Sequence, residues 1–441
     1  MLERIISKFK EVFSSKEIRK RVFFTLFVIV AFRILASIPI PGINPQAFIE
    51  QFGGSPFTNI FRAVTGGSLD NPSIVAVALG PYISASIVIQ LLQSVIKKLD
   101  DLSKEGQRGK MILNQYTRLL TVPITILQSL AIYATLKSKP DLLGDSSTLQ
   151  IVTMLVAITA GTMLLMWLAE LIAEHGIGNG PSIIISIGIL SALPGLISSD
   201  IKKFTDNGQI NILLIILLAF IVVIALIVFV NEAVRKVPIQ YASRVRGNKT
   251  YSTPASFFPI KVTTAGVMPI IFASSLLLFP QIISQLITST MNPGRFLYNV
   301  ADWLTKYFYN KVNPEIIWKY ELFYVVLIVA FTYFYTFVAF KPSDVAENLK
   351  KSGGFIPGIR PGGATAKYIT GILIRVTLVG SLFLGFIAVL PNIPTILGTG
   401  ITLALFTGIG GTSILIVVTV ILDTLRQINS LVVTRSYEKY K

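Results

Sequence analysis

Ten apolar stretches divide this chain, and the basic residues between them are sorted into alternate gaps. Counted from the N-terminus, the odd gaps hold 28 of the 39 Lys and Arg residues, the even gaps hold nine, and two lie inside stretches. With acidic residues included, and with Glu170 at the end of its stretch counted on the odd side, the odd gaps carry a net charge of +15 and the even gaps zero. Because Lys and Arg in short loops stay cytoplasmic, both termini are predicted to be cytoplasmic. The stretches are Val22–Ile38, Ser73–Ile96, Leu119–Leu136, Ile151–Ala173, Pro181–Ser198, Asn211–Val230, Val262–Thr290, Leu322–Phe340, Ile369–Pro391 and Ile396–Leu422.

The composition is that of a membrane protein. Apolar residues make up 52% of the chain and charged residues only 14%, with a mean hydropathy of +0.69. Soluble chains are usually about a quarter charged. Most of the stretches reach or approach the ~20 residues that cross a bilayer as a helix. We therefore expect one polytopic membrane domain, and the basic N-terminal segment lacks the small-residue site of a cleaved signal peptide.

The residues that most enzymes need are missing. Zero cysteines exclude disulfides and thiolate sites, and His175 is the only histidine. No stretch carries a pair of carboxylates, and Arg33 and Arg375, the only charges clearly inside stretches, lie close enough to an end to reach the surface along their aliphatic stems. No phosphate-binding glycine loop with lysine is present. We predict a protein that is not an enzyme and uses no metal or cofactor.

The net charge of +17 has two interpretations. Topology and contact with anionic lipid explain it simply, whereas a sided charge also suits an acidic partner such as ribosomal RNA or an acidic motor surface. Residues 1–21 predict a basic amphipathic helix, which is either an interfacial anchor or a docking platform. Two long odd-side loops, Val234–Lys261 and Lys341–Lys367, hold eleven Lys or Arg and are either a cytosolic contact surface or topogenic charge alone.

A glycine-flanked segment follows the first stretch. Phe57, Ile60, Phe61 and Val64 recur at the spacing of a two-turn amphipathic helix, with paired glycines on both sides. The segment is either a mobile lid or an ordinary interfacial loop helix.

Three stretches contain more Ser, Thr, Gly and Pro than a lipid-facing helix should. They are predicted to be interior, and the purely aliphatic Asn211–Val230 is predicted to face lipid. Five stretches per half would give inverted topology, which is found in many transport proteins. The three stretches are Ser73–Ile96, Pro181–Ser198 and Val262–Thr290.

Six motifs, in order along nearly the whole chain, closely resemble the SecY family, the channel subunit of the bacterial protein translocase. They are FRILASIPIPGI at 32–43, GPYISASIVIQLL at 80–92, GTMLLMWLAELIAEHGIGNG at 161–180, AGVMPIIFASS at 265–275, NLKKSGGFIPGIRPGGATAKYI at 348–369 and GGTSILIVV at 410–418.

The resemblance implies an all-α polytopic fold of the bacterial plasma membrane. Ten transmembrane helices would form two inverted five-helix halves around a central pore, sealed by a short re-entrant plug helix at about 53–71. The implied divisions are an N-terminal cytoplasmic helix at 1–21, an N-terminal half at 22–200, a C-terminal half at 201–425 with cytosolic loops at 232–261 and 341–367, and a cytoplasmic tail at 426–441.

The family's functional positions carry over onto this sequence as three sets. An aliphatic ring blocks the pore because it offers no ligand to ions or water. One ring position, Pro181, is proline in this chain, where the family usually has a branched aliphatic residue. The lateral gate opens the pore sideways into lipid. The ring matches Leu79, Ile83, Pro181, Ile185, Ile271 and Ile416; the gate matches Pro81, Ser84, Gln90, Thr264, Pro269 and Ser274; and contact with SecA or the ribosome matches Arg244, Arg246, Lys249 and Arg360.

The function that the resemblance implies is a passive protein-conducting channel. Unfolded secretory chains with signal peptides would cross it, and nascent transmembrane segments would leave through its side. The implied partners are SecA or the ribosome as the energy source, SecE as a clamp and SecG at the periphery. The alternative is a small-solute secondary transporter with inverted repeats, which needs a polar site at mid-membrane that this sequence does not show.

Overall fold

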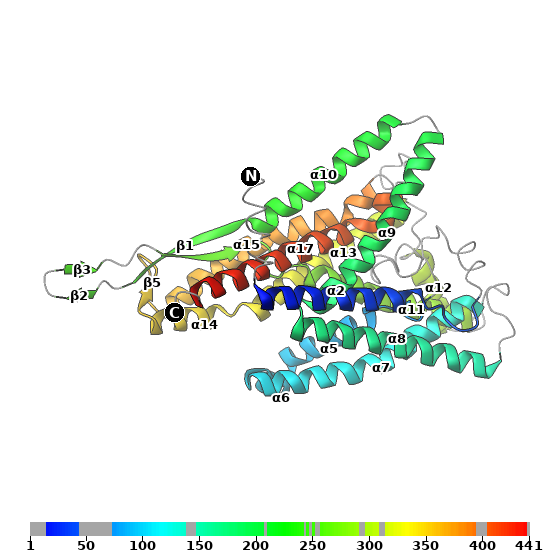
Figure 1. Ribbon diagram of the computed structural model, residues 1–441, viewed down its shortest axis with the longest axis horizontal. Helices are drawn as coiled ribbons and strands as arrows, with labels where there is room; N and C mark the ends of the chain where they lie inside the picture. The colour runs from blue at the N-terminus through cyan, green and yellow to red at the C-terminus, as the bar shows by residue number, and fades with distance from the viewer. Residues whose placement is uncertain are drawn as a thin grey trace.

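The computed structural model describes residues 15–43, 73–137, 147–206, 210–241, 244–246, 249–251, 256–290, 296–307, 314–393 and 404–438. Figure 1 shows most helices running side by side along the long axis of the molecule, with the strands projecting from one end. The helices are α2 (Lys16–Ser37), α5 (Gly80–Val95), α6 (Lys97–Lys104), α7 (Gln107–Lys137), α8 (Thr148–His175), α9 (Gly180–Asp206), α10 (Ile210–Glu232), α11 (Met268–Thr290), α12 (Phe296–Tyr307), α13 (Pro314–Ala339), α14 (Pro342–Lys351), α15 (Gly363–Val389), the 3-10 turn η2 (Leu390–Asn392) and α17 (Ala404–Glu438).

Each of the ten apolar stretches overlaps one of these helices. Among the described residues, six helices are long and apolar enough to cross a membrane by length and composition. Described parts of α10 and α11 form shorter apolar helices. The six are Gln107–Ala134, Thr148–His175, Gly180–Asp206, Ile316–Lys351, Gly363–Asn392 and Gly411–Thr434.

One apolar core joins the two halves of the chain. A single cluster of buried side chains draws on α2, α5, α8, α9, α10, α11, α13, α15 and α17. The longest shared packing surfaces include those of α9 with α17 and of α13 with α15. The outer face of α10 is exposed along its length, from Leu214 at 63% to Phe229 at 76%, as expected for the helix predicted to face lipid.

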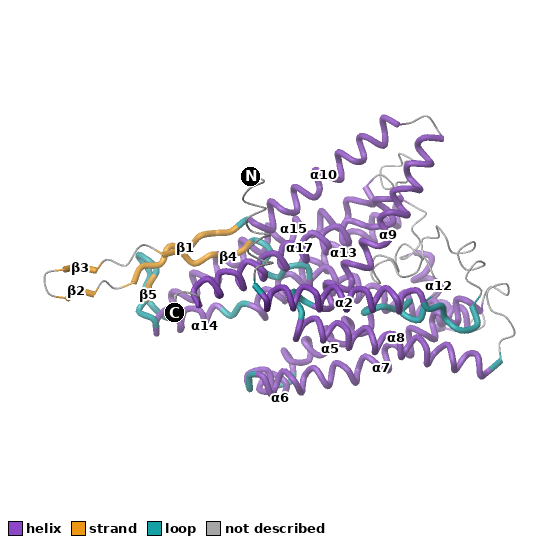
Figure 2. The backbone as a smooth tube through the Cα atoms, viewed as in Figure 1, coloured by secondary structure: helices purple, strands orange, loops and turns teal. Residues whose placement is uncertain are grey.

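The chain is mostly helical, as predicted, but one loop departs from an all-helical fold. Residues 234–261 form the strands β1 (Val234–Tyr241), β2 (Arg244–Arg246), β3 (Lys249–Tyr251) and β4 (Ser256–Lys261), drawn in orange in Figure 2. β1 pairs antiparallel with β4 and also with β5 (Gly354–Phe355). Alternate β1 residues Val237 and Ile239 are buried, so one face of the sheet packs on the helices and the other faces solvent.

Candidate functional site: an apolar centre between two helical halves

The second apolar stretch enters the core as turns rather than as helix. Residues 73–79 make successive short-range bonds, among them Ala76 N–H to the Ser73 carbonyl (2.9 Å) and Ala78 N–H to the Val75 carbonyl (2.8 Å). Ala78 has a positive φ of 47° and is 3% exposed. Irregular backbone at membrane depth is tolerated only where protein buries it or where it lines a cavity. This segment therefore marks the interior of the molecule.

A glycine on a neighbouring helix lets this segment approach. A Cβ at Gly161 of α8 would overlap the Ile74 carbonyl, so any larger residue would push the two backbones apart. Ile74 N–H in turn donates to the Ile38 carbonyl at the end of α2 (3.0 Å). The start of α5 is therefore held from two sides.

Three helices at the apolar centre begin in the same way. Pro81, Pro181 and Pro269 are each the second residue of a helix, namely α5, α9 and α11. A proline in the first turn costs no hydrogen bond, because the N–H that it lacks has no partner there in any residue. Pro81 and Pro269 lie in two of the stretches predicted to be interior, and both stand at helix starts.

Five of the six predicted ring residues lie in the same buried cluster. Leu79, Ile83, Ile185, Ile271 and Ile416 come from the start of α5 and from α9, α11 and α17, and none is more than 8% exposed. Four segments far apart in sequence thus bring aliphatic side chains into one core. The sixth residue, the predicted ring proline of α9, is only half-buried.

The predicted gate helices pack against each other. α11 packs on both α5 and α7, and it packs on α13 along its other side. α5 and α7 also pack together, and the short helix α6 joins them. The first half of the chain therefore meets the second along the α5/α7–α11 seam.

Three of the predicted gate side chains make their hydrogen bonds within their own segments. The Ser274 hydroxyl donates to the Ile271 carbonyl (2.9 Å), and Gln90 Nε2 donates to Ser86 Oγ (3.1 Å). Thr264 lies in the turn before α11 and donates to the Lys261 carbonyl (2.7 Å). None of these three bonds crosses the seam, so parting the helices would break none of them. The remaining gate residues, Pro81, Ser84 and Pro269, are buried.

Charged helix ends flank the seam at the end near the strands. Lys104 of α6 donates a hydrogen bond to Asp100, which holds the pKa of the Asp100 carboxyl below its ordinary value and that of Lys104 above its own. Lys341 adds a weaker attraction on Asp100, and Asp344 one on Lys104. Charges on α6 and at the start of α14 are therefore near enough to attract one another.

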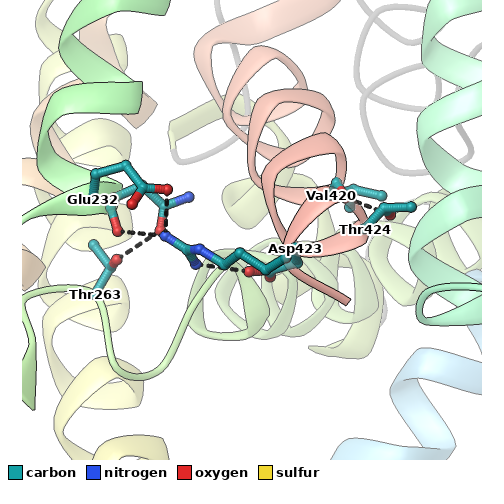
Figure 3. A network of polar contacts seen from close by, with 7 residues as sticks. Glu232, Thr263, Val420, Asp423 and Thr424 are labelled. Atoms are coloured by element: carbon teal, nitrogen blue, oxygen red, sulfur yellow. Dashed lines mark hydrogen bonds and ion pairs between the residues drawn. The ribbon is translucent and has the colours of Figure 1, made fainter. Parts of the chain in front are cut away.

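A group of polar contacts around one arginine, Arg426, joins α17 to the end of α10, as Figure 3 shows. Arg426 donates to the Asn231 carbonyl (3.0 Å), to Glu232 Oε1 (2.8 Å) and to Asp423 Oδ1 (3.0 Å). Thr263 Oγ1 donates to Asn231 Oδ1 (3.0 Å), which joins the turn before α11 to the same point. The planar guanidinium, with several fixed donors, suits a junction of this kind.

A second contact joins α17 to the first half of the chain. The turn between α8 and α9 donates from Ile177 N–H to Thr25 Oγ1 of α2 (3.1 Å) and from Gly178 N–H to Gln427 Oε1 of α17. Gly178 has φ +88°, a conformation that favours glycine. The sequence predicted neither contact, because each joins residues that are far apart in the chain.

The two basic loops form one projecting structure. β1 of the first loop pairs with β5 of the second, with Gln240 opposite Phe355. Predicted contact residues Arg244 and Arg246 lie on β2 and Lys249 lies on β3, with Arg246 opposite Lys249. The strands extend beyond the helices at one end of the molecule (Figure 1).

Arg360 sits at an exposed tip between two glycines. Gly358 has φ +82° and Gly362 has φ +107°, so both hold backbone conformations that other residues adopt only with strain. The Arg360 carbonyl accepts a hydrogen bond from Thr365 Oγ1 (3.0 Å) at the start of α15. The tip is therefore fixed to the helix that follows it.

The predicted plug residues Phe57, Ile60, Phe61 and Val64 lie outside the described residues.

Comparison with known proteins identifies the family. The SecY family model matches residues 73–425. The chain belongs to the SecY family. Protein translocase subunit SecY of Corynebacterium glutamicum is 39% identical over 97% of this chain and 98% of its own length. That of Streptomyces coelicolor is 40% identical over 99% of this chain and all of its own.

Solved channels share the fold of this SecY-family chain. A structure described as a protein conducting channel matches with a TM-score of 0.66 and 19% identity, over 93% of this chain and 92% of that one. Sec61 in the canine ribosome-channel complex matches with a TM-score of 0.63 and 18% identity, over the same shares. The order of helices described above is thus the order of a known channel fold.

Proposed function

We infer that this SecY-family chain is a protein-conducting channel. The observation that carries the inference is the apolar centre, where aliphatic residues of α5, α9, α11 and α17 meet in one buried cluster. An aliphatic constriction binds neither ions nor water, yet flexible side chains can part around an extended peptide. A small-solute transporter needs a polar site at the same place, whereas the five clustered ring residues are Leu and Ile.

The finer architecture belongs to the same proposal. Ten spans form two inverted halves, 22–200 and 201–425, around a pore closed by Leu79, Ile83 and their partners. The plug at about 53–71 seals the outer side. The α5/α7–α11 seam is the lateral gate, which suits its role because the Ser274, Gln90 and Thr264 side chains keep their hydrogen bonds as it opens.

The energy source is a cytosolic partner. SecA or a translating ribosome docks on the β-strand projection and the Arg360 tip, SecE clamps the two halves and SecG lies at the periphery.

The chain lies in the bacterial plasma membrane with both termini in the cytoplasm. Substrates are unfolded chains with apolar signal sequences, and transmembrane segments leave through the gate into lipid.

Reconstitution tests this proposal. The chain is purified with its partner subunits, placed in vesicles and supplied with SecA, ATP and an unfolded secretory precursor. We expect precursor to become protease-protected only when ATP and an intact signal sequence are both present. Protection of a small labelled solute in place of precursor would favour the transporter alternative and contradict the proposal.

A further inference from the structure

Helix α12 has no part in the channel described so far. It lies between α11 and α13, at the end of the molecule opposite the strands (Figure 1). One side of α12 packs on α11, where Ala301 is 2% exposed and Leu304 packs against the apolar core. The helix is therefore firmly attached to the gate helix.

A second apolar side of α12 is exposed. Phe296 is 79% exposed, Leu297 54%, Val300 42% and Trp303 56%. At 100° per residue, Phe296, Val300 and Trp303 fall within an arc of about 60° on one face. Four large apolar side chains on a three-turn helix are more than the scattered single exposures normal on a soluble surface.

A different face of α12, about 100° around the helix from this arc, is polar. Asp302 and Lys306 form an ion pair, with Lys306 Nζ and Asp302 Oδ2 2.9 Å apart. Asn299 lies beside them and is exposed. The helix thus has one face for an apolar medium and one for water, which is the pattern of helices that lie in the plane of a membrane interface.

The neighbouring helices indicate what covers the apolar face. Ile283 of α11 is 52% exposed, and Trp318 and Leu322 at the start of α13 are each 55% exposed. In a membrane-spanning chain these outward faces contact lipid, and α12 joins them. Tryptophan favours the boundary between acyl chains and headgroups, where Trp318 would lie at the start of a span.

We propose that α12 lies in the outer interface of the bilayer, with Phe296, Leu297 and Val300 among the lipid acyl chains and Asp302 and Lys306 toward water. The inference rests on the membrane topology of the proposed function. Since α12 packs on α11, lipid of the outer leaflet would then hold the outer end of the gate helix. The occupant of the exposed face is phospholipid rather than a protein partner.

Tryptophan quenching tests the proposal in the whole complex. The chain has three tryptophans, so the Trp167→Phe and Trp318→Phe changes leave Trp303 as the only one in this chain. The channel, with tryptophan-free partner subunits, is placed in nanodiscs of phospholipid brominated either near the ester end or near the methyl end of the acyl chain. Quenching near the ester end should be about twofold stronger, because an interfacial helix lies only ~5–10 Å deep.

A pair of variants separates insertion from simple proximity. Phe296→Asp together with Val300→Asp puts charge on the apolar face and should reduce bromolipid quenching about threefold or more, because charge is disfavoured among acyl chains. The control Asn299→Asp adds one carboxylate, against two in the double variant, on the polar face and should leave quenching unchanged. The main test uses the single-tryptophan channel without these changes, so it does not depend on whether the double variant is stable.

Two results would overturn the proposal. Strong quenching by aqueous iodide with none by bromolipid would place α12 in water. Protection from both quenchers would mean that a protein partner covers it. Precursor import is measured with the same single-tryptophan channel, so import without bromolipid quenching would refute the position of α12 while leaving the proposed function intact.

Discussion

Isoleucine side chains at the apolar centre combine burial with the ability to move. Ile83 and Ile271 are each 8% exposed, against 0% for Leu79, so they are the least enclosed of the five clustered ring residues, and they lie in the first turns of α5 and α11. Their only chemistry is apolar contact, which excludes water from a narrow passage.

Replacing Ile83 and Ile271 by serine should therefore open the channel to ions. Each change removes about 1.5–3 kcal/mol of apolar burial and adds a hydroxyl that retains water, so we expect resting conductance to rise roughly tenfold or more. Planar-bilayer recording measures it. Ile421→Ser on the exposed side of α17 is the control, and equal leak in control and double variant would refute the seal.

Arg360 is a fixed charge on a stiff tip, so its reversal should act locally. Arg360→Glu should reduce SecA-driven import, because like-charge contact at a docking site costs several kcal/mol and lowers affinity by at least about tenfold. Import assays with the reconstituted channel measure the loss, and blotting shows whether the channel still inserts. The control is Lys367→Glu, which makes the same change of charge on α15. If both variants import normally, Arg360 is only a topogenic charge.

At the scale of elements, the plug can be tested by removal. Deleting residues 53–71 should leave the channel assembled, because the segment is short and bounded by paired glycines. The deletion should raise the resting ion conductance of the channel and allow import of precursors with weakened signal sequences. Unchanged conductance in the same planar-bilayer assay would mean that the segment is only an interfacial loop.

The order of the apolar helices was predictable from the sequence, but their ends were not: α7 begins at Gln107, before its stretch, and α17 ends at Glu438, beyond its own. The ten apolar stretches each overlap a helix, but residues 73–79 are turns, because buried irregular backbone and buried helix have the same apolar composition. β1 and β4 were missed as well. Their alternation is short, at Val237 and Ile239, and the basic residues between drew the interpretation toward charge alone.

The ring positions could be proposed only from the family motifs, and their role in a pore stays a prediction. No pattern of spacing singles out Leu79 or Ile416 among so many aliphatic residues, and only the resemblance selected them. Contacts formed by tertiary packing had no sequence signal at all. Arg426 with Glu232 joins residues 194 apart, so only the folded chain brings them together.

At the scale of the whole molecule, the unequal distribution of basic residues between alternate loops predicts its orientation in the membrane. Because the chain has no native cysteine, single cysteines report topology cleanly. Cysteines replacing Gly106, Gly247 and Arg360 should react with a membrane-impermeant maleimide only from the cytoplasmic side. Those replacing Leu143 and Asn310 should react only from outside. Outside labelling at Gly247 would contradict the topology, whatever the other positions show.

The central claim is that a translocating chain passes through the apolar centre. A precursor with one cysteine is halted in transit by a folded C-terminal domain, and the channel carries one cysteine at Ile83, Ile185, Ile271 or Ile416. Disulfide adducts should form at all four positions and not at Phe229, which is 76% exposed on the outer face of α10. Adducts at Phe229 with none at the four ring positions would show that the chain takes another route.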